Sequence, residues 1–285
     1  MFDFFKRKKK NPLDELKGLV GNFELISFPA AVMNVLEMLR DPESTISEIA
    51  SQIEMDPGMH VKVLKMVNAA GFGLAKKVSN LQHAVTIMGR SRLESMVLTI
   101  AVAGSIPPAM ACMPMADFWR GSARRACLAR LLAQHIHAAT QAESFTAGLL
   151  QDIGMVVMDQ TNPQLYGAIF RKWHGDAEAR IDELERAHFG FDHAAVGALM
   201  AESWGLPEYL IQAIGAHHLP WDQSPAEQAV QLVAMLKYQA ENDGSDALIG
   251  AATNPPYGID ETLLSEMITR AFDDAGQFAS LFSSK

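Results

Sequence analysis

The stretch Phe145-Thr-Ala-Gly-Leu-Leu-Gln-Asp-Ile-Gly154 ends its mostly apolar run with a carboxamide, Gln151, followed directly by a carboxylate, Asp152. A carboxylate can hold a metal ion, whereas a neutral amide oxygen binds transition metals much more poorly than an imidazole nitrogen does. The stretch therefore looks like half of a metal site. It raises the question whether the chain is an enzyme or has the fold of one with an incomplete metal site.

The length and composition of the chain indicate a large helical protein. With 285 residues it can form one large or two small domains with an ample core. Apolar residues make up 49% and charged residues 20%, a balance that is ordinary for globular proteins and excludes a disordered chain. Leu, Ala, Met, Glu and Gln are abundant, and alternating β-branched runs are scarce, which favours helices over strands.

Helical periodicity recurs along the whole chain. Val32, Val35, Leu36 and Leu39 share one face of the first expected helix, which Asp41-Pro42 terminates. The pattern predicts helices over the following ranges, with a hinge near Gly89 inside the fourth: 29–39, 44–50, 57–67, 80–103, 118–139, 145–158, 162–173, 177–187, 192–204, 207–218, 225–240 and 260–283. The prolines in Gly104-Ser-Ile-Pro107-Pro108 predict a boundary between two lobes. We therefore expect an all-α architecture of two packed lobes.

The charge of the chain is unevenly distributed. Residues 1–10 carry a net charge of +4, so the remainder carries −13 of the total −9, and we expect no nucleic-acid binding by the body. Three phenylalanines followed by a basic run could contact an anionic membrane surface, although a solvated tail is the favoured interpretation. The segment lacks the apolar core and cleavage site of a signal peptide, and no window is long enough to span a bilayer.

The two cysteines, Cys112 and Cys127, indicate a reducing environment. They provide neither a disulfide framework nor the spacing of a metal knuckle, and we expect a cytoplasmic protein with Cys127 in the core. The isolated histidines are expected to be surface residues or satisfied core residues, and the two on one helix lie on different faces: His60, His83, His174 and His188, and the pair His135 and His137.

A series of short motifs connects the two lobes to one family. In chain order after Pro29 they are Asp56-Pro57, Lys65-Met-Val-Asn68, Leu81-Gln-His83-Ala-Val-Thr-Ile-Met-Gly89, Phe118-Trp119, Ala147-Gly-Leu-Leu-Gln-Asp-Ile-Gly154, Asp192-His193-Ala-Ala-Val-Gly197 and Trp204-Gly-Leu-Pro207. Their order and spacing resemble the HDOD family, the HD-related output domain of bacterial signalling proteins. The resemblance implies an HD-like helical bundle plus an N-terminal helical lobe, and a role in signal transduction without demonstrated catalysis.

The resemblance also implies a domain organisation. A basic and aromatic tail with a short helix is expected at 1–19 and the HDOD domain at 20–220, followed by a C-terminal helical extension at 221–285. Within the HDOD domain the N-terminal lobe covers about 20–106 and the HD-like lobe about 115–220.

The same resemblance identifies metal-ligand positions that have been lost. A working HD site needs several imidazoles and carboxylates around one or two metal ions. HD-type enzymes, including the HD-GYP phosphodiesterases, have a histidine where this chain has Gly121 and the doublet histidine where it has Gln151. Their closing aspartate falls near Leu236, and Met155 replaces a lysine that often follows the doublet glycine.

Four vestigial candidates remain, namely Asp152, His193, His217 and His218. With so many ligands lost, we expect no bound metal, no catalytic residue and no cofactor. Asp152 is then expected to be structural, capping a helix or bonding neighbouring backbone. His193 is equally compatible with an exposed helix start, and the histidine pair near a helix end with a role in the helix dipole.

We therefore expect a non-catalytic signalling or regulatory protein that binds a protein partner, or a nucleotide such as a cyclic dinucleotide, through its helical surface. The sequence does not name the partner. The alternative is a divergent metal-dependent phosphohydrolase of the HD or HD-GYP type, which would use the four vestigial residues on a cyclic dinucleotide or another phosphoester.

Overall fold

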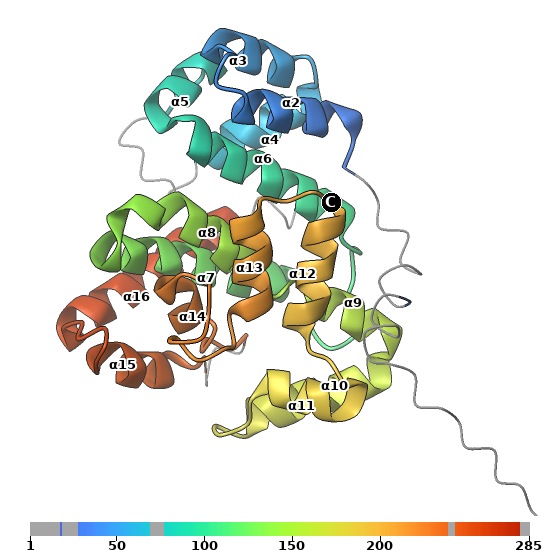
Figure 1. Ribbon diagram of the computed structural model, residues 1–285, viewed down its shortest axis with the longest axis vertical. Helices are drawn as coiled ribbons and strands as arrows, with labels where there is room; N and C mark the ends of the chain where they lie inside the picture. The colour runs from blue at the N-terminus through green and yellow to red at the C-terminus, as the bar shows by residue number, and fades with distance from the viewer. Residues whose placement is uncertain (1–17, 19–27, 69–76, 239–242, 280–285) are drawn as a thin grey trace, which may run out of the picture.

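The computed structural model describes residue 18 and residues 28–68, 77–238 and 243–279. Every regular element in these ranges is a helix, which confirms the all-α prediction (Figure 1). The predicted tail and short helix at 1–19, apart from Gly18, lie outside the described residues. No helix in the described part is long and apolar enough to cross a membrane.

The first lobe, at the top of Figure 1, consists of α2 (Ala30–Arg40), α3 (Ile46–Glu54), α4 (Pro57–Val67), α5 (Leu81–Met88) and α6 (Arg90–Ser105). The four residues predicted to share one face of α2 are all buried. Thr45 and Glu48 form a capping box at the start of α3, and Asp56 caps α4 ahead of Pro57. Gly89 joins α5 to α6 with a φ of 77°, a conformation that favours glycine.

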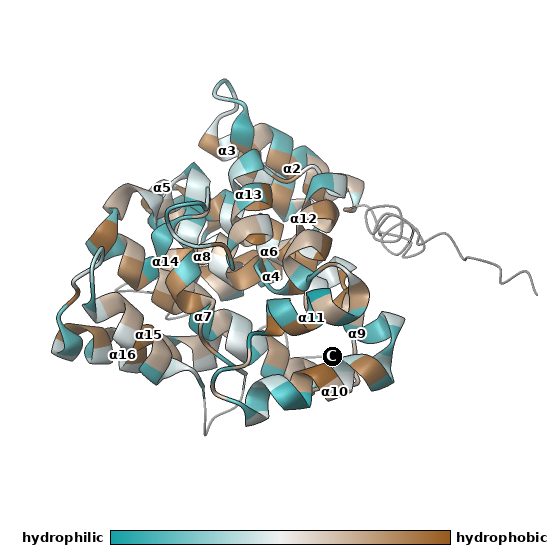
Figure 2. Cartoon of the chain, turned by 60° about the horizontal axis from the view of Figure 1, so that its bottom comes forward, coloured by the Kyte–Doolittle hydropathy of each residue, from teal (hydrophilic) through white to brown (hydrophobic). Residues whose placement is uncertain are grey.

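The second lobe holds the remaining helices. They are α7 (Met115–Ile136), a 3₁₀ turn (Ala138–Thr140), α8 (Gln141–Leu150), α9 (Ile153–Thr161), α10 (Pro163–Gly175), α11 (Ile181–Phe189), α12 (His193–Ser203), α13 (Glu208–Ala216), α14 (Gln228–Val233), α15 (Ser245–Thr253) and α16 (Glu261–Ala279). Helix α7 packs against α8, α14 and α16, so helices from the C-terminal part of the chain pack against the same body. In Figure 2, hydrophilic and hydrophobic residues are interspersed along α10 and α11.

Helix α6 packs against helices of both lobes. It packs against α2 and α4 on one side and against α8 on the other. The buried apolar residues of both lobes consequently form one continuous core. The site described below therefore rests on a scaffold that extends through both lobes.

Two sequence predictions about individual helices were wrong, and one helix was not predicted. The helix expected over 145–158 is interrupted at Gln151 and Asp152, which separate α8 from α9. The helix expected over 225–240 is only the six-residue α14, and its described continuation forms turns, with the Lys237 N–H donating to the Asp243 carbonyl at 2.6 Å. Helix α15 was not predicted, because its short Ala- and Gly-containing sequence carries a weak periodic signal.

Candidate metal centre

Asp152 lies in the break between α8 and α9, inside the second lobe. Its backbone leaves the helical region, and its side chain is almost completely buried. The carboxylate makes no capping bond to α9, so the prediction that it bonds neighbouring backbone was wrong. It contacts ionisable side chains from α7, α12 and the segment after α13 instead, because the break points it towards them.

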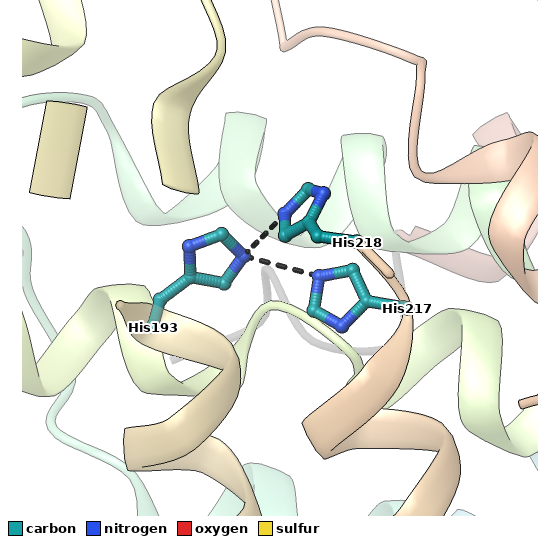
Figure 3. A group of neighbouring side chains, drawn as sticks. All are labelled: His193, His217 and His218. Carbon is teal, nitrogen blue, oxygen red and sulfur yellow. Dashed lines mark hydrogen bonds between the residues drawn. The ribbon is translucent and has the colours of Figure 1, made fainter. Parts of the chain in front are cut away.

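The three candidate histidines converge on one point, as Figure 3 shows. His193 Nε2 lies 3.1 Å from His217 Nε2 and 3.1 Å from His218 Nε2. Asp152 Oδ1 lies 3.4 Å from the Nε2 atoms of both His193 and His217. The structure thus brings all four vestigial candidates together, although they are up to 66 positions apart in the sequence.

His193 is held in place by the start of α12. Asp192 caps that helix by accepting from the Ala195 N–H at 2.9 Å. The next residue, His193, then has a backbone N–H without a helical partner, and it donates to Glu185 Oε2 at 2.8 Å. The imidazole is fully buried, so the alternative of an exposed helix-start residue was wrong.

In His193 and His217 the ring nitrogen that faces away from the centre, Nδ1, lies next to a hydrogen-bond acceptor. His193 Nδ1 lies 2.7 Å from Glu185 Oε2, and His217 Nδ1 lies 2.7 Å from the Ile214 carbonyl. Tyr166 donates to the other oxygen of Glu185 at 2.7 Å and fixes that carboxylate. Because Nδ1 is the donor in both rings, the Nε2 lone pairs of the neutral rings face the centre, which is the arrangement that metal-binding histidines adopt.

The donor set fits a single transition-metal ion. Four ligands at the usual zinc distances of about 2.0–2.1 Å in a tetrahedron would be about 3.3–3.4 Å apart. Four of the six separations among these donors, those that involve His193 Nε2 or join Asp152 Oδ1 to His217 Nε2, are 3.1, 3.1, 3.4 and 3.4 Å. The ligand atoms that all lie within 4.8 Å of one another are those of the three histidines. Imidazole nitrogens with one carboxylate oxygen suit zinc and related metals. The sequence prediction that no metal binds stays a prediction, and the geometry of the donors argues against it.

The charges around the centre support one cation. Burial opposes ionisation of Asp152, but Arg125 and the neighbouring imidazoles hold its pKa well below the usual value. Burial likewise opposes a charge on His193, but Glu185 and Asp152 raise its pKa well above the usual value. Burial, together with the other two imidazoles, lowers the pKa of His218 well below its usual value. The centre therefore favours a bound cation, either a proton on His193 or a metal ion that displaces it.

Two of the lost ligand positions are occupied by protein groups. A Cβ at Gly121 would overlap the ring of Tyr238, so only glycine fits beneath that ring. Leu236 lies in the core, and its carbonyl accepts a hydrogen bond from Arg125 Nη2. Tyr238 Oη and Arg125 Nε lie 2.8 Å and 3.3 Å from Asp152 Oδ2. Tyr238 and Arg125 therefore occupy the side of Asp152 that faces away from the histidines.

The other two altered positions contribute no ligand atom. Gln151 is buried, and neither atom of its amide has a hydrogen-bond partner among the described residues. Met155 is buried in the apolar core.

Sequence reasoning missed several groups of this network: Arg125, Tyr166, Glu185 and Tyr238. A signal existed for Arg125, because it follows Gly121 by four residues and shares its face of α7. Tyr238 carried no such signal, since its position depends on the turns that follow α14.

A cleft of about 1150 Å³ opens beside the centre. Its lining includes His217 and His218 together with Arg180 and Lys237. Leu219, Trp221 and Met235 line it as well and are among the exposed large apolar residues. The cleft is bordered by the segment before α11 and by the C-terminal helices.

Fold and site together define an all-α, two-lobed protein with a buried histidine and carboxylate centre in its second lobe. The sequence pattern of the HDOD domain matches residues 25–220, and the chain belongs to this family. A protein of Treponema pallidum (strain Nichols), described as uncharacterized, is 26% identical over 198 residues. That match covers 68% of this chain and 38% of the relative, so the chain spans less than half the length of this curated relative.

Solved structures with the same fold are also similar. An HDOD domain protein with unknown function from Geobacter sulfurreducens matches with a TM-score of 0.70 at 20% identity, over 95% of this chain and 100% of that one. A candidate phosphohydrolase from Shewanella amazonensis SB2B matches with a TM-score of 0.71 at 23% identity, over 92% and 97%. At these identities the likeness shows the fold alone.

Proposed function

We propose that the chain is a non-catalytic regulator of bacterial signal transduction, which binds a partner and whose HDOD domain is organised by one divalent metal ion. The convergence of three imidazoles and the Asp152 carboxylate carries this proposal. Structural zinc sites are closed by four protein ligands, whereas catalytic sites keep a position open for water or substrate. Asp152 Oδ1 lies 3.4 Å from two of the three imidazoles and supplies the fourth protein ligand of the proposed site, which favours a structural or sensing ion over a hydrolytic one.

Two features extend the proposal to the binding partner. The apolar side chains of Leu219, Trp221 and Met235 at the cleft offer contact area to a signalling protein or to the base of a nucleotide such as a cyclic dinucleotide. The −13 net charge outside residues 1–10 disfavours extended nucleic acid. A cytoplasmic location and a solvated tail at residues 1–10 are part of the proposal, with contact to an anionic membrane surface as the alternative for the tail.

The first test is the metal content of the purified full-length chain. We expect about one zinc or similar ion per chain, and a zinc-dependent rise in the melting temperature of chelator-treated protein. His217→Ala removes a direct ligand and should weaken zinc affinity by at least the roughly 10–100-fold seen for supporting groups. His83→Ala, an exposed histidine in the first lobe, is the matched control and should bind zinc as the wild type does. Substoichiometric metal without stabilisation by zinc would contradict the proposal.

One observation favours a second candidate function, a metal-dependent phosphohydrolase. The cleft reaches His217 and His218, so a phosphoester could approach an ion held there, with Arg180 nearby. The metal-loaded preparation discriminates between the two functions when it is incubated with a cyclic dinucleotide and a phosphomonoester. We expect no turnover; metal-dependent hydrolysis that disappears in Asp152→Ala would replace the proposed function by the enzymatic one.

A further inference from the structure

The side of Asp152 that faces away from the histidines is sealed by two side chains. Oδ1 faces the imidazoles, whereas Oδ2 receives the Tyr238 hydroxyl at 2.8 Å and lies 3.3 Å from Arg125 Nε. The side chains of Arg125 and Asp152 are only 2% and 6% exposed. In two-metal sites the ions lie about 3.5–4 Å apart, and a carboxylate that bridges them through both of its oxygens offers one oxygen to each ion. Here the second oxygen is already occupied.

Arg125 and Tyr238 support one another in this position. The guanidinium lies over the phenol ring, 4.3 Å from its centroid, and donates from Nη2 to the Leu236 carbonyl. Phe118 stacks on the same ring with a centroid separation of 5.8 Å. The Tyr238 N–H also donates to His174 Nε2 at 3.3 Å. A fixed positive charge is therefore placed beside Asp152 by packing as well as by attraction.

Gly121 is the third member of this arrangement. A Cβ at position 121 would overlap Cδ1 and Cε1 of Tyr238 and lie 3.3 Å from Cγ. A metal-binding side chain at this position and the tyrosine ring are consequently mutually exclusive. The missing ligand at position 121 and the tyrosine at position 238 are therefore linked, because the Tyr238 ring fits only above a glycine.

We infer that Arg125 and Tyr238 take the place of a second cation and restrict the centre to one metal ion. Arg125 supplies a permanent charge to Asp152 Oδ2, and Tyr238 orients the same oxygen by its hydroxyl. The inference rests on the proposed metal site, because it concerns the number of ions that this site accepts. Both residues are positioning residues, since they act on the ion through Asp152.

The test is metal stoichiometry, measured by native mass spectrometry with excess zinc and by the paramagnetic resonance of bound manganese. Wild-type protein is expected to saturate at one ion per chain, without the spin coupling of a manganese pair. Gly121→His combined with Tyr238→Ala and Arg125→Ala removes the seal and adds a ligand, and it should bind two ions.

Each outcome separates this inference from the proposed function. Two ions in wild-type protein, or one ion in a folded triple variant, would overturn the inference and leave the metal site intact. No ion in wild-type protein would overturn the proposed function itself. Tyr238→Phe keeps the ring and removes only the hydroxyl, so it serves if the triple variant does not fold. It should still bind one ion, about 10-fold more weakly, and an unchanged affinity would show that the hydroxyl does not position Asp152.

Discussion

The two lobes bury polar groups in opposite ways. In the described part of the first lobe the buried polar residues are Ser95, Thr99 and Ser105, and each hydroxyl donates to the carbonyl four residues earlier. In the described part of the second lobe the buried residues include nine ionisable side chains: Arg125, Asp152, Asp159, His174, Asp182, Glu185, His193, His217 and Lys237. The first lobe is an apolar scaffold, whereas the second contains a charged network.

The two lobes differ in how far their buried polar groups depend on residues elsewhere in the chain. A hydroxyl that bonds its own helix needs no partner from elsewhere, so the first lobe can be stable on packing alone. A buried ion is tolerated only when other groups compensate its charge, so each charged residue of the second lobe depends on distant residues. We therefore expect equally conservative substitutions to have large effects near the centre and small effects in the first lobe.

The largest effect is expected from Gly154→Ala in α9. An alanine Cβ there would overlap the His193 carbonyl oxygen and lie 2.7 Å from the Gly197 nitrogen, and both are backbone atoms of α12. The helices must separate, which should lower the free energy of unfolding by about 3 kcal/mol. It should also displace His193 and weaken zinc binding. Chemical denaturation and a zinc titration measure the two consequences.

The matched control for this substitution lies in the first lobe. Gly104 is a helical glycine in α6, with no atom within 4 Å of an added Cβ. Gly104→Ala should raise stability by up to about 1 kcal/mol, since alanine favours the helix. Equal losses at positions 104 and 154 would break the comparison between the lobes.

His174 provides an intermediate, pH-dependent effect. Burial is the main cause that lowers its pKa to about 4, with Lys237 and Arg125 adding to it. The unfolded chain binds this proton near pH 6.5, so the stabilising contribution of neutral His174 is present above pH 6.5 and lost as the pH falls towards 4. Protonation also removes the acceptor for the Tyr238 N–H, a loss of about 1–2 kcal/mol.

The measurement is the stability difference between wild-type protein and His174→Gln across this range. Wild-type protein should be the more stable of the two at pH 7.5, and the difference should shrink between pH 6.5 and about 4. The isolated and more exposed His60 supplies the control substitution, His60→Gln. A difference that stays constant with pH would show that His174 does not hold Tyr238 through its neutral form.

The contrast between the lobes also explains what the sequence could predict. The buried face of α2 was predicted correctly, because a helix with one apolar face carries its own periodic signal. The break at Gln151 and Asp152 was not predicted, because both residues lie inside an apolar run. Just after the break Gly154 packs against the backbone of α12, a contact between segments far apart in the chain that periodicity does not reveal.

The candidate site shows the same limit more sharply. The resemblance to a family identified His193, His217 and His218 by position, but only the fold shows that their nitrogens converge. The substitutions at Gly121 and Leu236 counted as losses in the sequence. The partners Arg125 and Tyr238, which turn them into a sealed side of Asp152, become evident only from contacts between distant segments.

The smallest effect is expected from Thr45→Ala at the start of α3. Thr45 Oγ1 accepts from the Glu48 N–H at 3.2 Å, and its own N–H donates to Glu48 Oε2 at 2.7 Å. Loss of this cap should lower the free energy of unfolding by about 1 kcal/mol. Ser51→Ala in the same helix removes an exposed hydroxyl without a capping role and should change stability by no more than about 0.5 kcal/mol. Zinc affinity should be unchanged in both variants, because the first lobe supplies no group to the centre. A weaker affinity in Thr45→Ala alone would mean that the first lobe controls the geometry of the second through α6 and α8.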